Sequence, residues 1–260
     1  MIDWLKSSLD SRLGQYTMGV AAHLLLLLVW YLFVRLGDVP KFVMPSPGDT
    51  FAALLQPNYD WWKNSVVTGT EIFGGYALAL VAGVGLALMF TWSKLLEALV
   101  LPLLVTLNMI PKVALGPLII VWFKYGVFPN TLMAFSIAVF PILLTTARGL
   151  REIEPDLLDL VRSLRGSRWQ LFTKIQLPGA LPYIFSGMKV AAILAVAGAI
   201  VGEFLGSDRG LGYLMLQVQV TLDTPAMFMA VILITLLGVV LYGLVLALEH
   251  WLVPKDARIS

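Results

Sequence analysis

The chain has 260 residues, of which 59% are hydrophobic and 13% charged, and its mean hydropathy is +0.86. Soluble domains carry about 25% charged residues, so this chain has too few charges to coat a soluble surface and most of it must face lipid. A formal net charge of +2 gives no basic excess for binding nucleic acid. The sequence has no cysteine, which excludes disulfides, and its two histidines, His23 and His250, are too far apart to suggest a zinc or haem site.

Six windows of the sequence are long and apolar enough to cross a membrane. A helix needs about 20 mostly apolar residues to cross a hydrocarbon layer roughly 30 Å thick, and these runs are too long for the alternating strands of a membrane barrel. The sequence therefore predicts an all-α membrane protein with six transmembrane helices. The windows are 17–36, 66–90, 98–123, 127–147, 183–205 and 227–252.

The first window is expected to stay in the protein as an anchor. Its apolar run is longer than the apolar region of a signal peptide, and no small-residue cleavage site follows it. If the amino terminus is in the cytoplasm, eleven basic residues fall on that side and five on the opposite side, one of them Arg35 at the end of the first window. The positive-inside rule therefore places both termini in the cytoplasm.

The segment between the first two windows, 37–65, is long enough to have structure of its own. It contains Ser46-Pro47-Gly48-Asp49, a pattern typical of a helix N-cap followed by proline at the first helical position. We expect a short surface helix to follow, covering residues 51–55.

The segment between the fourth and fifth windows, 148–182, is the most charged part of the chain, yet it carries apolar residues at helical spacing. Pro155 favours a helix start, Gly166-Ser167 a break and Pro178 an end, so the segment is predicted to form two short amphipathic helices. Such a pair could lie on the bilayer surface or dock onto another protein, and periodicity alone does not decide between these interpretations.

Within this segment, the run Asp159-Leu160-Val161-Arg162-Ser163-Leu164-Arg165-Gly166 is followed by Ile175-Gln176-Leu177-Pro178. The pattern resembles the EAA loop of bacterial ABC importer permeases: Glu-Ala-Ala, three residues, glycine, nine residues, an aliphatic residue, any residue and Leu-Pro. Further stretches are similar to the subgroup that imports nitrate, sulfonates, taurine and bicarbonate. They are Met44-Pro45-Ser46-Pro47, Ile110-Pro111-Lys112-Val113-Ala114-Leu115, Trp122-Phe123 and Gly202-Glu203-Phe204 with Gly210-Leu211-Gly212-Tyr213.

The resemblance implies a type I ABC importer permease fold with a cytoplasmic coupling helix. It implies one permease domain over 1–260, with the anchor span and an extracytoplasmic segment in 1–65, core spans in 66–252 and the coupling segment in 148–182. It also implies a multi-pass protein of the bacterial inner membrane. The implied partners are a second permease copy, two ABC ATPase subunits, an extracytoplasmic solute-binding protein and the lipid bilayer.

On the matching positions, Asp159 takes the place of the motif glutamate and Arg165 that of the motif glycine. Gly166 follows at once, so either the turn is displaced by one residue or Arg165 adopts the positive φ that glycine usually provides. The resemblance assigns contact with the ATPase to Asp159, Leu160, Val161, Arg162, Ser163, Arg165, Gly166, Leu177 and Pro178.

The chain has no Gly-x-x-x-x-Gly-Lys-Ser/Thr run, the loop that cradles nucleotide phosphates in P-loop ATPases. We therefore expect it to be no enzyme and to hold no cofactor. ATP and magnesium would be bound by the partner ATPase.

The third window contains the best candidate for a transport-path residue. Lys112 lies midway along it, between Pro111 and Gly116-Pro117, where the helix is expected to break. Broken helices at mid-depth often line substrate sites. We therefore expect Lys112 and Asn108 to face the path and Lys112 to favour an anionic solute. The alternative is an internal ion pair of Lys112 with Glu71 or Glu203.

Other residues within the spans have simpler interpretations. Glu71 and Glu203 fall near the outer ends of their spans, so we expect solvated helix ends, with gating or binding-protein docking as the alternative for Glu203. Glu203 is also counted with Asn108 and Lys112 among the candidate residues of the substrate path. Lys189 is expected to reach the interface with its long side chain. Glycines of the second span are expected to allow close helix packing. They are Gly74, Gly75, Gly83 and Gly85.

Two other classes of protein compete with the importer permease. A secondary transporter or channel acting without an ATPase would need intramembrane acidic groups or a pore-lining repeat, and only Glu71 and Glu203 approach this. A membrane enzyme would need a catalytic cluster or metal-binding set, and none is found in the sequence. Both are less well supported than the permease interpretation.

Overall fold

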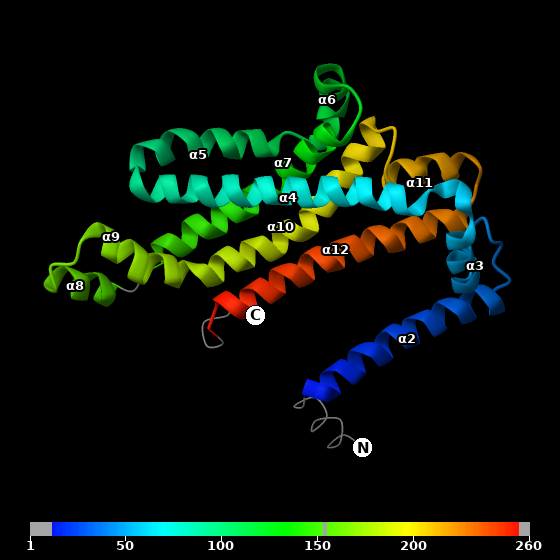
Figure 1. The fold of residues 1–260 in the computed structure, drawn as a ribbon, viewed down its shortest axis with the longest axis horizontal. Helices are drawn as coiled ribbons and strands as arrows, with labels where there is room; N and C mark the ends of the chain where they lie inside the picture. The colour runs from blue at the N-terminus through cyan, green and yellow to red at the C-terminus, as the bar shows by residue number, and fades with distance from the viewer. Residues whose placement is uncertain (1–11, 153–154, 255–260) are drawn as a thin grey trace. The chain divides into compact units, whose positions relative to one another are not determined.

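The computed structural model describes residues 12–152 and 155–254, and all regular elements in these ranges are helices. This confirms the predicted all-α fold (Figure 1). The longer helices, in chain order, are α2 (Arg12–Leu36), α3 (Pro47–Ala52), α4 (Trp61–Trp92), α5 (Lys94–Met109), α6 (Gly116–Phe123), α7 (Val127–Arg151), α8 (Pro155–Ser163), α9 (Arg168–Leu171), α10 (Leu177–Gly206), α11 (Leu211–Val220) and α12 (Thr224–Leu252).

Five stretches of the described chain are long and apolar enough to cross a membrane, and a bent pair of helices makes a sixth. The number agrees with the six predicted spans. The single stretches are Thr17–Leu36, Pro57–Trp92, Val127–Gly149, Arg168–Gly206 and Thr224–Leu252, and the bent pair is Lys94–Met109 with Lys112–Phe123.

The described chain forms two compact units. Unit one contains the described residues up to Tyr59 together with Met215–Val231, and unit two contains Asp60–Leu214 and the described residues from Ile232 onward. The single permease domain expected over 1–260 stays a prediction.

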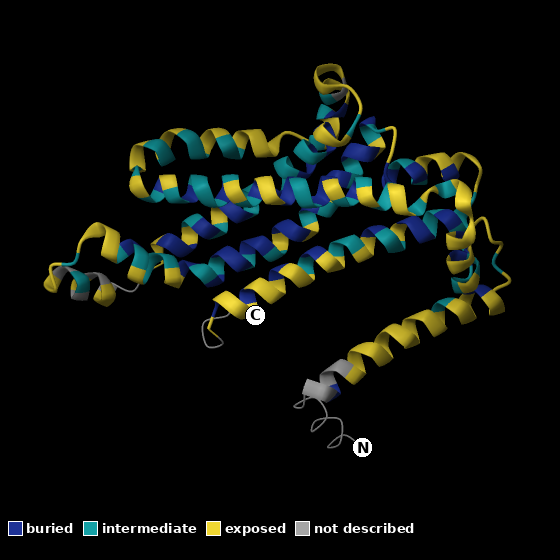
Figure 2. Ribbon diagram, in the orientation of Figure 1, coloured by how far each residue is buried: buried dark blue, intermediate teal, exposed yellow. Residues whose placement is uncertain are grey.

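Unit one contains α2, which is exposed along most of its length (Figure 2). Only 6% of its most apolar window is buried, as expected for a helix that faces lipid. Trp30 of α2 donates its indole N–H to the Pro45 carbonyl at 3.0 Å, and its ring lies 5.7 Å from that of Phe228. These contacts connect α2 to the segment that precedes α3 and to the first part of α12, within unit one.

The predicted N-cap of α3 is confirmed. The Ser46 hydroxyl accepts the Asp49 N–H at 3.2 Å, and Pro47 occupies the first helical position. Asp49 also pairs with Lys41 at 2.5 Å. The Lys41 ammonium, followed by the Ser46 hydroxyl, lowers the pKa of Asp49 because both stabilise its charged form.

In unit two, α7 packs against both α4 and α10. Small residues permit the close approach: a Cβ added at Gly75 of α4 would lie 2.7 Å from the Thr131 carbonyl oxygen, and one at Gly198 of α10 would lie 2.7 Å from the Ala134 Cα. Gly83 is similarly close to α7, as predicted, whereas a Cβ at Gly85 would meet nothing within 4 Å. Two buried side chains of α7, Ala134 and Ala138, are themselves small.

The third predicted span, 98–123, is not one straight helix. It is divided into α5 and α6 by a short 3₁₀ turn, Lys112–Leu115, and the two helical parts are bent by 84°. Ile110 has an extended backbone because a residue before proline is pushed out of the helical region. The predicted break is confirmed, and it begins at Ile110, the residue before Pro111.

The predicted end of a helix at Pro178 is wrong. A π-helical turn, Phe172–Gln176, joins α9 directly to α10, and Pro178 lies in the first turn of α10. In the π turn the Leu177 N–H donates to the Phe172 carbonyl five residues back. This wider turn carries the helix past a proline that lacks an N–H.

Lys189 does not act as an isolated snorkelling lysine. Its ammonium pairs with Glu249 of α12 at 3.1 Å, and the two side chains are 18% and 7% exposed. The pair joins α10 to α12 inside unit two. The sequence interpretation missed it because 60 residues separate the partners.

Gly75→Ala is expected to lower the free energy of unfolding by about 1–3 kcal/mol, the usual cost of overpacking. The added Cβ would lie 2.7 Å from the Thr131 carbonyl oxygen and 2.9 Å from the Phe135 amide nitrogen. Gly85→Ala is the matched control on the same helix; it meets open space and should not destabilise, since alanine favours helix. Thermal unfolding of the purified protein in detergent measures both, and equal melting temperatures for the two variants would contradict the proposed packing.

Candidate functional site

The segment that contains the predicted ATPase-coupling residues forms an elbow of two short helices, α8 and α9. α8 begins at Pro155 and ends at Ser163, and the predicted break follows it. Arg165 has φ 54°, and the Gly166 N–H donates to the Val161 carbonyl at 2.8 Å. This is the Schellman arrangement, in which the residue after the C-cap takes the left-handed conformation.

Arg165 therefore occupies the backbone position at which the EAA pattern has glycine, and the turn is not displaced. A non-glycine residue in the left-handed region costs roughly 1–2 kcal/mol. Gly166 meets a different requirement, since a Cβ there would lie 2.6 Å from the Val161 Cγ1 atom. Arg165 is thus constrained by its backbone conformation, and Gly166 by the lack of space for a side chain.

The second half of the elbow starts with a complete capping box. Ser167 accepts the Gln170 N–H at 3.2 Å, and the Gln170 side chain accepts the Ser167 N–H at 2.8 Å. The buried ring of Phe172 then lies 5.7 Å from Trp92, at the end of α4, and 5.8 Å from Trp169. The elbow is thus attached to α10 through the π turn and to α4 through an aromatic contact.

The elbow exposes several apolar side chains. Leu157, Leu164 and Trp169 are 39%, 73% and 64% exposed. Asp159, Ser163 and Arg165 are exposed, as is Pro178, whereas Leu177 and Val161 are partly buried. The side chains of Leu160 and Arg162 lie outside the described residues. The elbow is therefore an ordered, hydrogen-bonded turn that exposes both apolar and charged side chains.

A groove of about 800 Å³ lies where α4 meets α5. Figure 1 shows this junction of the two helices at the same end of unit two as α8 and α9. An ion pair between Arg151 of α7 and Glu97 of α5 borders the groove. Close by, Arg148 pairs with Glu152 at 3.1 Å and lowers the pKa of Glu152 by stabilising its charged form. The basic residues at the end of α7 are thus held by carboxylates.

Lys112 does not form the internal ion pair considered from the sequence. Its ammonium donates to the Leu107 carbonyl at 2.9 Å, and among the described residues no ion pair joins it to Glu71 or Glu203. Lys112 is partly buried and Asn108 is exposed. That both face the path stays a prediction.

Glu71 and Glu203 are buried, with exposed fractions of 0% and 1%, so the expectation of solvated helix ends is wrong. The carboxyl of Glu71 on α4 lies against that of Glu203 on α10. Asn130 of α7 donates its amide N–H to Glu71 at 2.8 Å, and the Thr68 hydroxyl donates to Glu203 at 2.5 Å. Three helices therefore contribute to one buried polar cluster.

Glu203 also accepts hydrogen bonds from the first turn of α11, a helix that begins within unit two. It accepts the N–H of Gly212 and, at 3.3 Å, that of Tyr213. The Leu211 N–H donates to the Thr68 hydroxyl at 2.8 Å, and the Gly210 N–H to the Asn64 side chain at 2.9 Å. The first N–H groups of a helix have no partner within the helix and attract negative charge, which explains why a carboxylate sits here.

This contact gives a structural reason for the sequence motifs around residues 202–204 and 210–213. Gly210 has φ +107°, a conformation that suits only glycine, and a Cβ at Gly212 would lie 2.8 Å from a carboxylate oxygen of Glu203. The glycines were visible in the sequence. That they wrap around Glu203 was not, because the loop that brings them back follows no regular periodicity.

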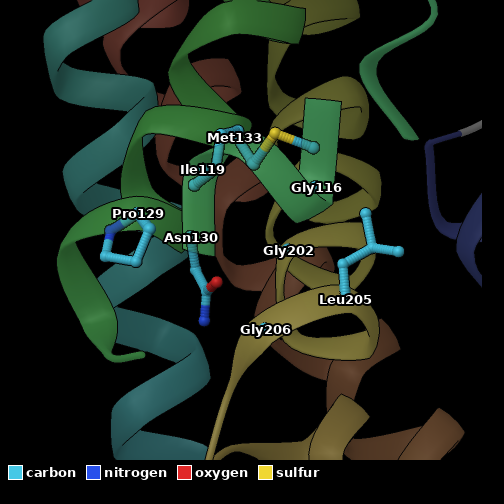
Figure 3. Close-up of a pocket in the computed structure, with 8 residues that line it drawn as sticks. All are labelled: Gly116, Ile119, Pro129, Asn130, Met133, Gly202, Leu205 and Gly206. Atoms are coloured by element: carbon cyan, nitrogen blue, oxygen red, sulfur yellow. The ribbon is translucent and has the colours of Figure 1, made fainter. Parts of the chain in front are cut away.

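A small cavity lies beside this cluster, between α6, α7 and α10 (Figure 3). Its volume of about 10 Å³ is near the least that holds one water molecule, so it is no solute site. Its lining consists of Gly116, Ile119, Pro129, Asn130, Met133, Gly202, Leu205 and Gly206.

Arg165→Gly should stabilise the elbow by about 1 kcal/mol, because glycine adopts the left-handed conformation without strain. Amide hydrogen exchange in α8 should slow roughly fivefold, the factor that corresponds to this energy. Arg165→Val should speed the same exchange, since a β-branched residue is least compatible with a positive φ. Unchanged exchange in both variants would contradict the strained turn.

The chain matches proteins of known type over most of its length. Residues 75–254 match the family described as binding-protein-dependent transport system inner membrane component. The riboflavin transport system permease protein RibX of Chloroflexus aurantiacus is 35% identical over 243 residues, covering 92% of this chain and 91% of that protein. The bicarbonate transport system permease protein CmpB of Synechococcus elongatus is 28% identical over 256 residues, covering 93% and 91%.

A solved structure has the same fold. The inward-facing methionine ABC transporter MetNI contains a chain that matches 72% of this one, over 93% of its own length, with a TM-score of 0.50 and 21% identity. The family match covers most of the chain, and RibX, a permease, is similar over nearly its whole length. Both findings are consistent with a helical protein of six spans. The chain belongs to the family of binding-protein-dependent transport system inner membrane components, the permeases of ABC importers.

Proposed function

We propose that this permease works in a bacterial inner membrane with both termini in the cytoplasm, paired with a second copy of itself. Two separate ATPase subunits, which bind ATP and magnesium, would drive it, and an extracytoplasmic binding protein would deliver the solute. The family supports this assembly, and the excess of basic residues at one side of the spans supports the orientation. The observation that carries the proposal is the α8–α9 elbow.

The elbow is suited to receive force from another protein. Its exposed apolar residues, Leu157, Leu164 and Trp169, offer a surface to a partner, while its own turns are fixed by the Schellman and capping-box hydrogen bonds. We assign the contact to the elbow residues named from the sequence, which are 159–163, Arg165 and Gly166, with Leu177 and Pro178 at the base. To these we add the exposed Leu164. The alternative, an elbow lying on lipid, would leave the ATPase without this contact.

The movement of the elbow would pass into the membrane along α10. This helix runs from Leu177 to Gly206 without a break, and its 30 residues span about 45 Å at 1.5 Å per residue. The aromatic contact of Phe172 with Trp92 would move the end of α4 with it. A rigid-body rocking of the packed helices follows from this geometry.

Leu164→Asp is expected to weaken binding of the ATPase subunits and to lower solute uptake at least tenfold, a loss typical of a hydrophobic contact residue at an interface centre. Leu164 is 73% exposed, so the change should not unfold the permease. Leu55→Asp, at a residue 85% exposed in unit one, is the matched control. Copurification with the ATPase and uptake into proteoliposomes measure the effect.

If Leu164→Asp keeps both copurification and uptake at the level of Leu55→Asp, the elbow is not the docking element. Uptake by the permease alone, without ATPase or binding protein, would instead support a secondary transporter or channel.

The solute class rests on Lys112. Its ammonium has only a carbonyl partner among the described contacts, and a positive charge in a partly buried position would favour a small anion, with Asn108 as a polar neighbour. The relative CmpB is named for the transport of bicarbonate, an anion. A second candidate is a flat heterocycle, because RibX, named for riboflavin transport, has the higher identity.

Lys112→Met and Lys112→Arg separate these solute classes. For an anionic solute, we expect Lys112→Met to reduce uptake by about tenfold or more and Lys112→Arg to retain most of it, since arginine keeps the charge. Uptake driven by the ATPase and binding protein, with solutes of each class, is the measurement. Normal anion uptake by an intact Lys112→Met complex would refute the role of Lys112.

A further inference from the structure

The buried carboxyls of Glu71 and Glu203 have no basic partner. Among the described residues, no lysine, arginine or histidine forms an ion pair with either of them. α7 contributes the uncharged Asn130, and α11 contributes Tyr213 through its backbone N–H. The nearby loop residues Asp208 and Arg209 pair with each other at 3.6 Å and are about 60% exposed.

Two carboxylates in contact, away from water and without a counter-charge, cannot both be ionised. Burial disfavours each charge, and the proximity of the second charge disfavours it further. Carboxyl pairs in this situation share one proton. The cluster therefore needs one positive charge that the described side chains do not supply.

The hydrogen-bond donors identify which carboxyl stays ionised. Glu203 accepts three donors: the Thr68 hydroxyl and the N–H groups of Gly212 and Tyr213. Glu71 accepts one, from Asn130, and its Oε2 atom has no partner although it is fully buried. The donor-rich site stabilises a carboxylate at Glu203, and the unpartnered oxygen of Glu71 is the position for the proton.

A metal cation fits this cluster less well than a proton does. Cations such as Ca²⁺ require six to eight oxygen ligands. Here N–H and O–H donors point at the carboxylate of Glu203, and a donor hydrogen repels a cation. Among the described residues no group of three or more acidic, histidine or cysteine side chains could hold a metal ion.

The same cluster holds the start of α11 in place. Thr68 of α4 donates to Glu203 and accepts the Leu211 N–H, so one hydroxyl links α4, α10 and α11. A second negative charge on Glu71 would compete for the Thr68 hydroxyl and repel Glu203. The link between the three helices would loosen as a result.

We propose that Glu71 and Glu203 form a proton-binding site in which Glu71 carries the proton, and that its loss releases the start of α11 from α4 and α10. The proposal does not depend on the solute or on the ATPase. The proposed proton-binding site lies beside the turn that connects α10 to α11.

The stability of the purified permease should depend on pH through this proton. In the folded chain Glu71 holds a proton that the exposed carboxyl of the unfolded chain has already lost above about pH 5. Because the folded chain binds one proton more than the unfolded chain, the ratio of folded to unfolded protein falls as pH rises. The fall is up to about tenfold per pH unit. The melting temperature should therefore fall from about pH 6 to about pH 9.

Glu71→Gln tests the site because glutamine has the shape of a protonated glutamate and cannot ionise. We expect its melting temperature to lose most of the dependence on pH. Glu152→Gln, which removes an exposed carboxyl outside the cluster, is the matched control and should keep the wild-type profile. A pH profile of Glu71→Gln equal to that of wild type would overturn the proposal.

Infrared spectroscopy gives a second, direct measurement. The carbonyl stretch of a protonated carboxylic acid should be present in wild type at neutral pH, kept in Glu152→Gln and absent in Glu71→Gln. Its presence in all three would show that the proton lies elsewhere. Replacing sodium by choline should leave the melting temperature unchanged, and a sodium-dependent rise would assign the site to a cation instead.

Discussion

The close approach of α7 to α4 and α10 is the constraint on which the rest of unit two depends. Gly75 and Gly198 bring the three backbones near enough for small side chains such as Ala134 to fill the space between them. In lipid, where apolar burial gives little advantage, such van der Waals contact is a principal source of helix association. The same close approach brings Glu71, Asn130 and Glu203 together in one buried cluster between the helices.

α10 connects the two ends of this arrangement. Its first turn is joined to the elbow through the π turn, and its last turns carry Glu203. The Lys189–Glu249 pair fixes the same helix to α12 part of the way along. A displacement at the elbow and a change of charge at Glu71, against Glu203, would therefore both act on the one continuous helix α10, which gives a physical route by which the two ends of the permease can respond to each other.

Local features of the structure could be predicted from the sequence, while long-range contacts could not. The apolar windows predicted the spans, Ser46 predicted a cap, and Pro111 predicted the break beside Lys112, because each depends on neighbouring residues only. The break of the EAA-like elbow after Ser163 was similarly local, although the sequence left open whether Arg165 or a turn displaced to Gly166 would supply the left-handed conformation. The burial of Glu203 depends on Thr68, 135 residues away, and on a loop that returns to it, so the sequence suggested a solvated helix end instead.

The turn at Phe172–Gln176 determines the direction in which the elbow points. A π turn is equivalent to one extra residue inserted into an α-helix. Each residue of an α-helix rotates the chain by roughly 100° about the axis. Shortening this turn by a single residue would thus swing α8 and α9 onto another side of α10 while leaving every residue of the elbow unchanged. The direction in which the elbow points is therefore set by the five residues of the π turn, which lie outside the elbow.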